Sequence, residues 1–209
     1  MKTAHWIAII IVATAVAAAG QSIEVPYRGL DYSMLSKGGV TVMVAPLDLT
    51  ILHYAAAHVW ITNGSARTIL VSPQAFVARA RTSKQAQAAE FPGSADNKVV
   101  NDVMEHARYG DVLALVRAYE RNLYGFKNPT AINYYQERKQ VAAAEGSSRR
   151  FRAGAMVSAL VLPKTQVPPG EFREGTVFFP VNDKKAQFTE FSVEIGGLSF
   201  VFRPPRGSE

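Results

Sequence analysis

The chain has 209 residues, 48% of them apolar, and a formal net charge of +6 at pH 7. About 200 residues is the size of one ordinary domain that buries an apolar core without crosslinks. Cysteine is absent, which excludes disulfide scaffolds, thiolate chemistry and lipid attachment through cysteine. The positive charge is also too modest for a nucleic-acid-binding protein, which gathers its basic residues on one face.

The first twenty residues have the three parts of a secretory signal peptide. Lys2 supplies the positive charge, Trp6 to Val16 form an apolar run, and small residues fill positions 17–20. We therefore expect residues 1–20 to be a signal peptide and residues 21–209 to form one extracytoplasmic domain, periplasmic or secreted. The alternative is an uncleaved anchor, but the apolar run is shorter than the ~20 residues that span a bilayer.

Alternating apolar residues predict strands in the first half of the mature chain. These predicted strands are 40–44, 57–62, 68–71 and 76–81. Within the second of them, Ala57, Val59 and Ile61 share one face, which we predict to be core, while His58 and Trp60 lie on the other.

Turn and loop residues connect these strands. Asn63, Gly64 and Ser65 accept positive φ and predict a hairpin between the second and third strands. Residues 83–95 are mainly Ala, Gln, Ser and Gly, show no strand or helix pattern, and are predicted to be a loop.

The hydrophobic period changes from two to about 3.6 in the middle of the chain. A first helix is predicted after Asn97, a second from Gly110 to Gly125, and a third after Pro129. Together they form a predicted helical insert over about 97–146.

The strand pattern returns in the last third of the chain. The predicted strands are 155–162, 176–181, 191–195 and 198–202. The last two flank Gly196-Gly197 and predict a two-residue hairpin. Residues 149–152, Arg-Arg-Phe-Arg, are interpreted first as a solvated entry to strand 155–162 and second as an anion-binding patch.

Seven or eight short strands with one helical insert favour a mainly β, antiparallel two-sheet sandwich, α+β overall. The runs 59–63, 169–171 and 175–179, with the phenylalanine-rich closing hairpin, resemble secreted bacterial immunoglobulin-like domains of the telokin-like kind. The resemblance implies an immunoglobulin-like scaffold without carrying over any site residue. The helical insert departs from that pattern.

Local motifs of hydrolases, zinc proteases and phosphate-binding loops are absent from the sequence. His53 and His58, with Tyr54 and Trp60 nearby, form one polar-aromatic concentration, but the two histidines point to opposite faces of a straight strand. Asp102, Glu105 and His106 lie close together on the first predicted helix, where such residues ordinarily form a solvated face. We therefore expect no catalytic, metal or cofactor residue.

The predicted insert is rich in tyrosine and arginine, the residue types enriched at protein interfaces. One interpretation is that the rings dock the helices on the sheets. The other is a partner-binding surface formed by Arg117, Tyr119, Arg121, Tyr124, Tyr134, Tyr135 and Arg138.

We expect a noncatalytic extracytoplasmic binding or assembly module of the cell envelope, whose partner is another envelope protein or cell-surface component. The insert is expected to be the functional element and to be separable from the sandwich. The alternatives are an envelope enzyme that acts on glycan or peptide through a dispersed site, and a structural subunit that pairs through a sheet edge. Membrane contact is expected only through the signal segment if it stays uncleaved.

Overall fold

The computed structural model describes residues 22–27, 29–83, 85–124, 148–183 and 185–203. The predicted signal peptide, the third predicted helix and residues 204–209 lie outside these ranges. None of the helices in the described ranges is both long and apolar enough to span a membrane.

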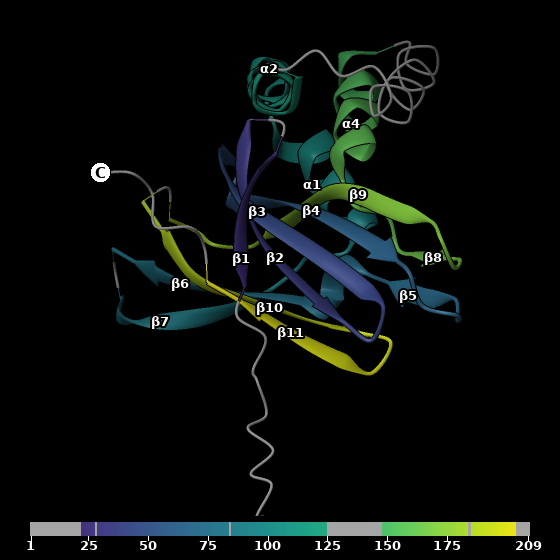
Figure 1. Ribbon diagram of the computed structural model, residues 1–209. Helices are drawn as coiled ribbons and strands as arrows, with labels where there is room; N and C mark the ends of the chain where they lie inside the picture. The colour runs from purple at the N-terminus through teal and green to yellow at the C-terminus, as the bar shows by residue number, and fades with distance from the viewer. Residues whose placement is uncertain (1–21, 28, 84, 125–147, 184, 204–209) are drawn as a thin grey trace, which may run out of the picture.

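The structure is mainly β, with 51% strand and 26% helix arranged around several antiparallel sheets. Figure 1 shows one sheet of five strands, in the spatial order β1 (Ile23–Tyr27), β2 (Leu30–Lys37), β3 (Val40–Ile51), β4 (Tyr54–Asn63) and β9 (Phe172–Phe179). The second sheet has the order β11 (Leu198–Phe202), β10 (Gln187–Ile195), β6 (Phe76–Thr82) and β7 (Gln85–Pro92). A two-stranded ribbon pairs β5 (Ile69–Val71) with β8 (Thr165–Val167).

The two larger sheets share one apolar core. Alternate side chains of β4, among them Val59 and Ile61, are fully buried and belong to the same cluster as Phe200 and Phe202 of β11. Period-two alternation places these side chains on one face of each strand, and burial of that face holds the sheets together. The predicted core face of β4 and the predicted hairpin β10–β11 are confirmed.

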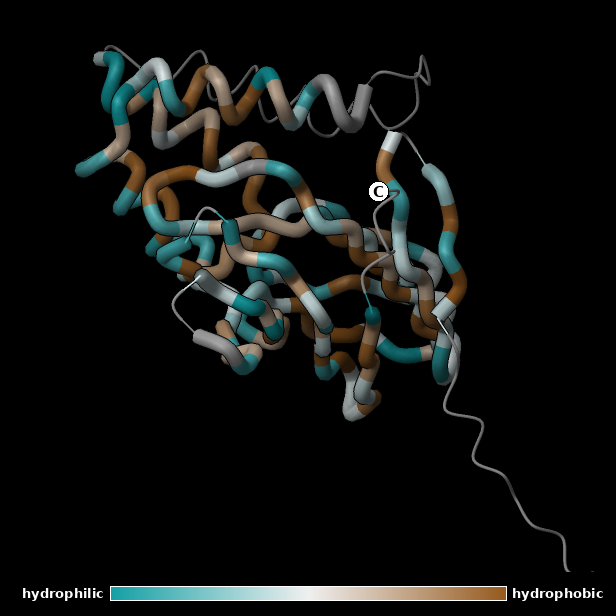
Figure 2. Tube along the Cα trace, turned by 90° about the vertical axis from the view of Figure 1, so that its left-hand side faces the viewer, coloured by the Kyte–Doolittle hydropathy of each residue, from teal (hydrophilic) through white to brown (hydrophobic). Residues whose placement is uncertain are grey.

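Within the described residues, three helices cover part of the opposite face of the five-stranded sheet: α1 (Asp96–His106), α2 (Tyr109–Tyr124) and α4 (Arg149–Leu160). Figures 1 and 2 show the helices as a separate layer on one side of the sheets. A second apolar cluster fills the junction, with Leu115 and Val116 of α2 against Leu47 and Ala45 of β3. The five-stranded sheet is therefore buried on both faces where the helices lie.

The structure corrects several predictions. Residues 83–95, predicted to be a loop, contain the edge strand β7, and residues 155–162, predicted to be a strand, lie mostly in α4. The turn at 63–65 does not join a hairpin, because β4 pairs with β3 and β9 while β5 pairs with β8. Strands β1 and β2 had no counterpart among the predictions.

α4 forms because several local features favour a helix over a strand. Ser148 caps its first turn by accepting a hydrogen bond from the Phe151 N–H. Its buried residues Ala153, Val157 and Leu160 follow the i, i+4, i+7 spacing of a helix face. Residues 149–152 are therefore the first turn of a helix instead of the entry to a strand.

Three glycines are required by backbone conformation or by close packing. Gly196 and Gly197, at φ +60° and +78°, form the turn of the β10–β11 hairpin. Gly175 on β9 lies so close to the next segment that a Cβ would stand 2.7 Å from Leu162 Cα. This contact accompanies the hydrogen bond from Leu162 N–H to the Thr176 carbonyl, which covers part of the β9 edge.

Candidate functional site

A hydrogen-bonded cluster joins the end of the β3–β4 hairpin to α1. The Tyr54 hydroxyl donates to Asp102 Oδ2 at 2.5 Å, and Lys98 Nζ donates to the same oxygen at 2.7 Å and to Tyr54 Oη at 3.1 Å. Lys98 and Asp102 meet because they are four residues apart on one helix. The His53 ring packs against that of Tyr54, with centroids 4.2 Å apart and ring planes tilted by 34°. We call Tyr54, Lys98 and Asp102 the clasp.

The clasp sets the protonation states of its members. Burial, together with the hydrogen bond to Asp102, raises the pKa of Tyr54. The hydrogen bonds from Lys98 and Tyr54 lower the pKa of Asp102, and that from Lys98 to Asp102 helps raise the pKa of Lys98 to about 12. Tyr54 therefore keeps its proton and Asp102 its charge across the neutral range. These shifts oppose proton transfer and suit a structural link between sheet and helix.

His106 and His58 are not members of the clasp. His106 Nδ1 lies 3.2 Å from the Asp102 carbonyl oxygen, which is a backbone contact, and His58 is fully buried between the sheet and the helices. Its Nδ1 is 2.8 Å from the Tyr32 hydroxyl, and its ring centroid is 5.9 Å from that of Tyr119. Within the part of the chain that the structure describes, no three His, Asp or Glu side chains are placed to hold a metal ion.

The structure places two side chains of the predicted partner-binding set. Arg117 is exposed on α2, whereas Tyr119 is 4% exposed and belongs to the core between helix and sheet. Tyr119 is therefore a packing residue, because helical spacing puts it on the same face as Val112 and Val116. The remaining members, which lie outside the described residues or have undescribed side chains, are Arg121, Tyr124, Tyr134, Tyr135 and Arg138.

An apolar row crosses the helix-facing side of the five-stranded sheet beyond the helices. The strand registers place Ile23 opposite Met34, Met34 opposite Met43, and Met43 opposite Trp60. Cross-strand partners point to the same face, so these four side chains lie side by side. Glu174 of β9 ends the row. We call this row, with its neighbour Phe172, the apolar row.

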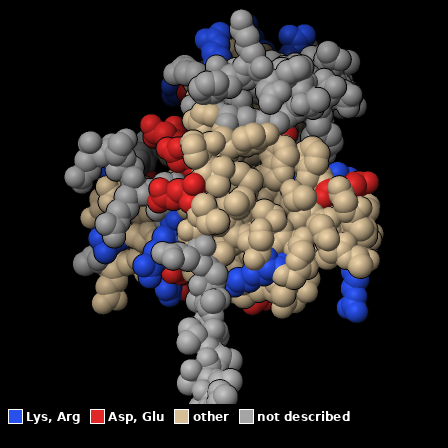
Figure 3. Space-filling view, in the orientation of Figure 1, with Lys and Arg blue, Asp and Glu red and all other residues tan. Residues whose placement is uncertain are grey.

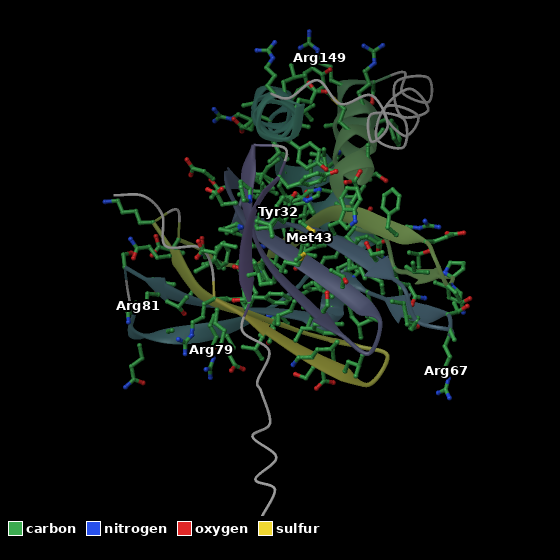
Figure 4. All side chains as sticks on the ribbon, viewed as in Figure 1. Tyr32, Met43, Arg67, Arg79, Arg81 and Arg149 are labelled. Carbon is green, nitrogen blue, oxygen red and sulfur yellow. The ribbon has the colours of Figure 1, made fainter. Side chains whose placement is uncertain are left out.

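The apolar row is partly open to solvent. Ile23 is 61% exposed and Phe172 42% exposed, and the residues between them are half-buried. In Figure 4, Met43 lies on this face farther from the helices than Tyr32, which the helix layer buries. Figure 3 shows that side chains other than Lys, Arg, Asp and Glu cover most of the centre of this view.

Aromatic packing stiffens the β4–β9 end of the row. Phe172 stacks on Trp60 with centroids 4.6 Å apart and ring planes at 6°, and Tyr27 meets Trp60 edge to face at 5.9 Å. Trp60 Nε1 donates to Thr62 Oγ1 at 3.2 Å. A surface hollow of about 290 Å³ lies beside Phe172, against residues 170–174. Such fixed, exposed rings are typical of contact surfaces, because little side-chain entropy is lost when a partner covers them.

Sequence patterns pointed to this surface only in part. The sequence predicts that Trp60 lies on the face opposite the core. The apolar row, however, depends on the registers of five strands, and two of these, β1 and β2, have no counterpart among the predicted strands. Searches of protein-family models, of curated proteins and of solved structures found no match to this chain.

Proposed function

We propose that the protein is a noncatalytic binding module of the cell envelope that holds an apolar helical segment of a partner protein on the apolar row. The observation that carries this proposal is the open row itself, with Phe172 42% exposed and stacked on Trp60. Export through the N-terminal signal segment, and an immunoglobulin-like character of the two facing sheets, belong to the same proposal.

A helix suits the row for geometric reasons. The row crosses four strand spacings, about 19 Å, which is the length of a helix of about 13 residues. The same sheet face already binds α2 through Leu115, Val116 and Tyr119, so its pleat accepts a helix. Met34 and Met43 add flexible, polarizable side chains that adapt to a partner's surface. A partner helix would lie beside the existing helix layer and complete the cover of the sheet.

The two alternatives have less support. Pairing through a sheet edge is opposed at β1 by Pro26, which lacks an N–H, and by Glu24, and at β7 by Pro92. Catalysis at the clasp is opposed by the raised pKa of Tyr54 and the lowered pKa of Asp102. The binding proposal does not depend on either site.

Site-specific photo-crosslinking tests the proposal. A benzoylphenylalanine at position 172 should crosslink to one discrete envelope protein in the native cell, through a predominantly apolar helical segment. The control is the same probe at Leu70, which is 54% exposed on β5. Trp60→Ala should remove the adduct from position 172. Identical adducts from both positions, or none from position 172, would refute the proposal, and a crosslinked homodimer would identify a second copy as the occupant instead.

A further inference from the structure

The first turn of α4 carries several positive charges at the end of the helix where the helix dipole disfavours them. Arg149, Arg150 and Arg152 occupy this turn, and no acidic residue does. The N-terminus of a helix carries a partial positive charge, so each arginine there is unfavourable for the isolated helix. Arg150 is explained locally, because its Nε donates to the Met104 carbonyl oxygen at 2.6 Å near the end of α1. Among the described residues, the Arg149 side chain makes no comparable hydrogen bond.

The same turn exposes an aromatic side chain among the arginines. Phe151 is 62% exposed, the largest exposure among the large apolar residues described. It lies opposite the buried face of α4, because its position is half a turn away from Ala153 and Val157. Arg117 points outward on the neighbouring helix α2, opposite Leu115 and Val116.

The first turn of α4 sits at one extreme of the molecule. Figure 4 shows Arg149 at the outer end of the helix layer, with Arg67, Arg79 and Arg81 at distant positions around the sheets. Figure 3 shows basic atoms projecting at this end. We call Arg117, Arg149, Arg150, Phe151 and Arg152 the arginine tip.

We propose that the arginine tip docks the protein on the surface of an anionic phospholipid bilayer. Arg117 and Arg149 complement the lipid phosphates, and Phe151 enters the interfacial layer, as aromatic residues do in interfacial helices. A protein partner fits less well, because the buried centre of a specific protein interface is apolar and depleted of charge, and the tip has a single apolar side chain among charges. This goes beyond the proposed binding function and revises the expectation that only the N-terminal segment contacts the membrane.

Vesicle sedimentation of the full chain tests the proposal. Binding to vesicles of phosphatidylglycerol with phosphatidylcholine should exceed binding to pure phosphatidylcholine vesicles, and the excess should fall as salt rises. Each arginine near an anionic surface strengthens binding about fivefold, so Arg117→Gln with Arg149→Gln should lower it about 25-fold. Phe151→Ser should lower it about tenfold. All variants keep the same N-terminus, so any contribution from that segment cancels.

Matched controls separate the tip from net charge. Arg67→Gln with Arg81→Gln removes the same two charges from exposed positions on the sheet side and should leave vesicle binding nearly unchanged. Circular dichroism melting shows that each variant is folded. Equal loss in both double variants would overturn the proposal, as would equal binding to both kinds of vesicle. Binding to soluble polyglutamate without binding to vesicles would also overturn it and would identify an acidic protein as the partner.

Discussion

Tyr54 of β4 donates its hydroxyl hydrogen to Asp102 of α1 over 2.5 Å, which ties the five-stranded sheet to the helix layer across 48 residues of sequence. Tyr54 is almost fully buried, and the side chain of Asp102 is 24% exposed. Hydrogen bonds to a charged group in such surroundings contribute more than those at the open surface. The clasp therefore fixes the position of α1 on the sheet.

Asp102→Asn should lower the free energy of unfolding by about 1–2 kcal/mol, because it removes the charge that both donors meet. Denaturant titration measures this change. Glu105→Gln, an exposed change on the same helix, is the matched control and should have little effect. Combining Asp102→Asn with Tyr54→Phe should cost less than the sum of the single changes, and strict additivity would show that the two groups do not interact.

The clasp also predicts how stability depends on pH. The pKa of Asp102 is lower in the folded state than its usual 3.8, so the unfolded state takes up the proton more readily. Its contribution is complete above about pH 4 and is lost as the pH falls through the lower, folded-state value. Asp102→Asn should therefore flatten the acid limb of the stability profile. An unchanged acid limb in this variant would assign acid unfolding to other groups.

On the basic side of the pH profile, the stability contributed by the clasp falls as the pH rises. The pKa of Tyr54 is raised and that of Lys98 rises to about 12, so the folded state holds both protons more tightly. Their contribution is complete below about pH 10 and is lost as the pH rises through the folded-state values. Tyr54→Phe should reduce this loss in denaturant titrations between neutral and strongly basic pH. A wild-type profile that stays flat through that range would contradict the prediction.

The elements that the sequence revealed are those in which local pattern and tertiary burial agree. The β10–β11 hairpin alternates apolar and polar residues around Gly196-Gly197, and the structure buries the alternating residues. The sequence predicts a strand where α4 lies because the run from Ala155 to Leu162 is apolar apart from Ser158, and such nearly continuous apolar runs do not distinguish a helix from a buried strand. The sequence does not predict β7, because this edge strand consists mainly of Ala and Gln and lacks an alternating pattern of strongly apolar residues.

The candidate functional surfaces are harder to predict from the sequence than the strands and helices. The clasp brings together Tyr54 and Asp102 from distant segments, and the apolar row exists only in the register of β1 to β4 and β9. The Arg-Phe-Arg run was visible in the sequence, but its exposure at a helix start followed only from the structure. These surfaces therefore depend on long-range pairing of segments, which the periodicity of a single sequence does not encode.

Phe200→Ala should lower the free energy of unfolding by about 3–5 kcal/mol, because Phe200 is fully buried between the sheets and its truncation leaves a cavity. Thermal melting or denaturant titration measures the loss. The adjacent Val201, 48% exposed on the same strand, supplies the control: Val201→Ala should change stability by less than about 0.5 kcal/mol. Similar melting of the two variants would mean that the hairpin does not close the core.

The packing of the helix layer on the sheet indicates whether the predicted helical insert can be removed without unfolding the sheets. Replacing residues 97–146 with a short Gly/Ser linker would remove Val99, Val103, Val112 and Leu115, which are buried in one cluster with Tyr32 of the sheet. Although closing a shorter loop changes the chain entropy only slowly, the deletion would open the helix-facing side of the sheet to water. We therefore expect the deletion variant to lose its cooperative thermal transition and to bind a hydrophobic dye, which revises the expectation from sequence. Tyr119→Ala, a milder change in the same cluster, should lower the free energy of unfolding by about 3 kcal/mol, whereas Arg117→Ala on the outward face of α2 should change it little. A deletion variant that melts cooperatively near the temperature of the full chain would instead show that the sheets fold independently of the helices.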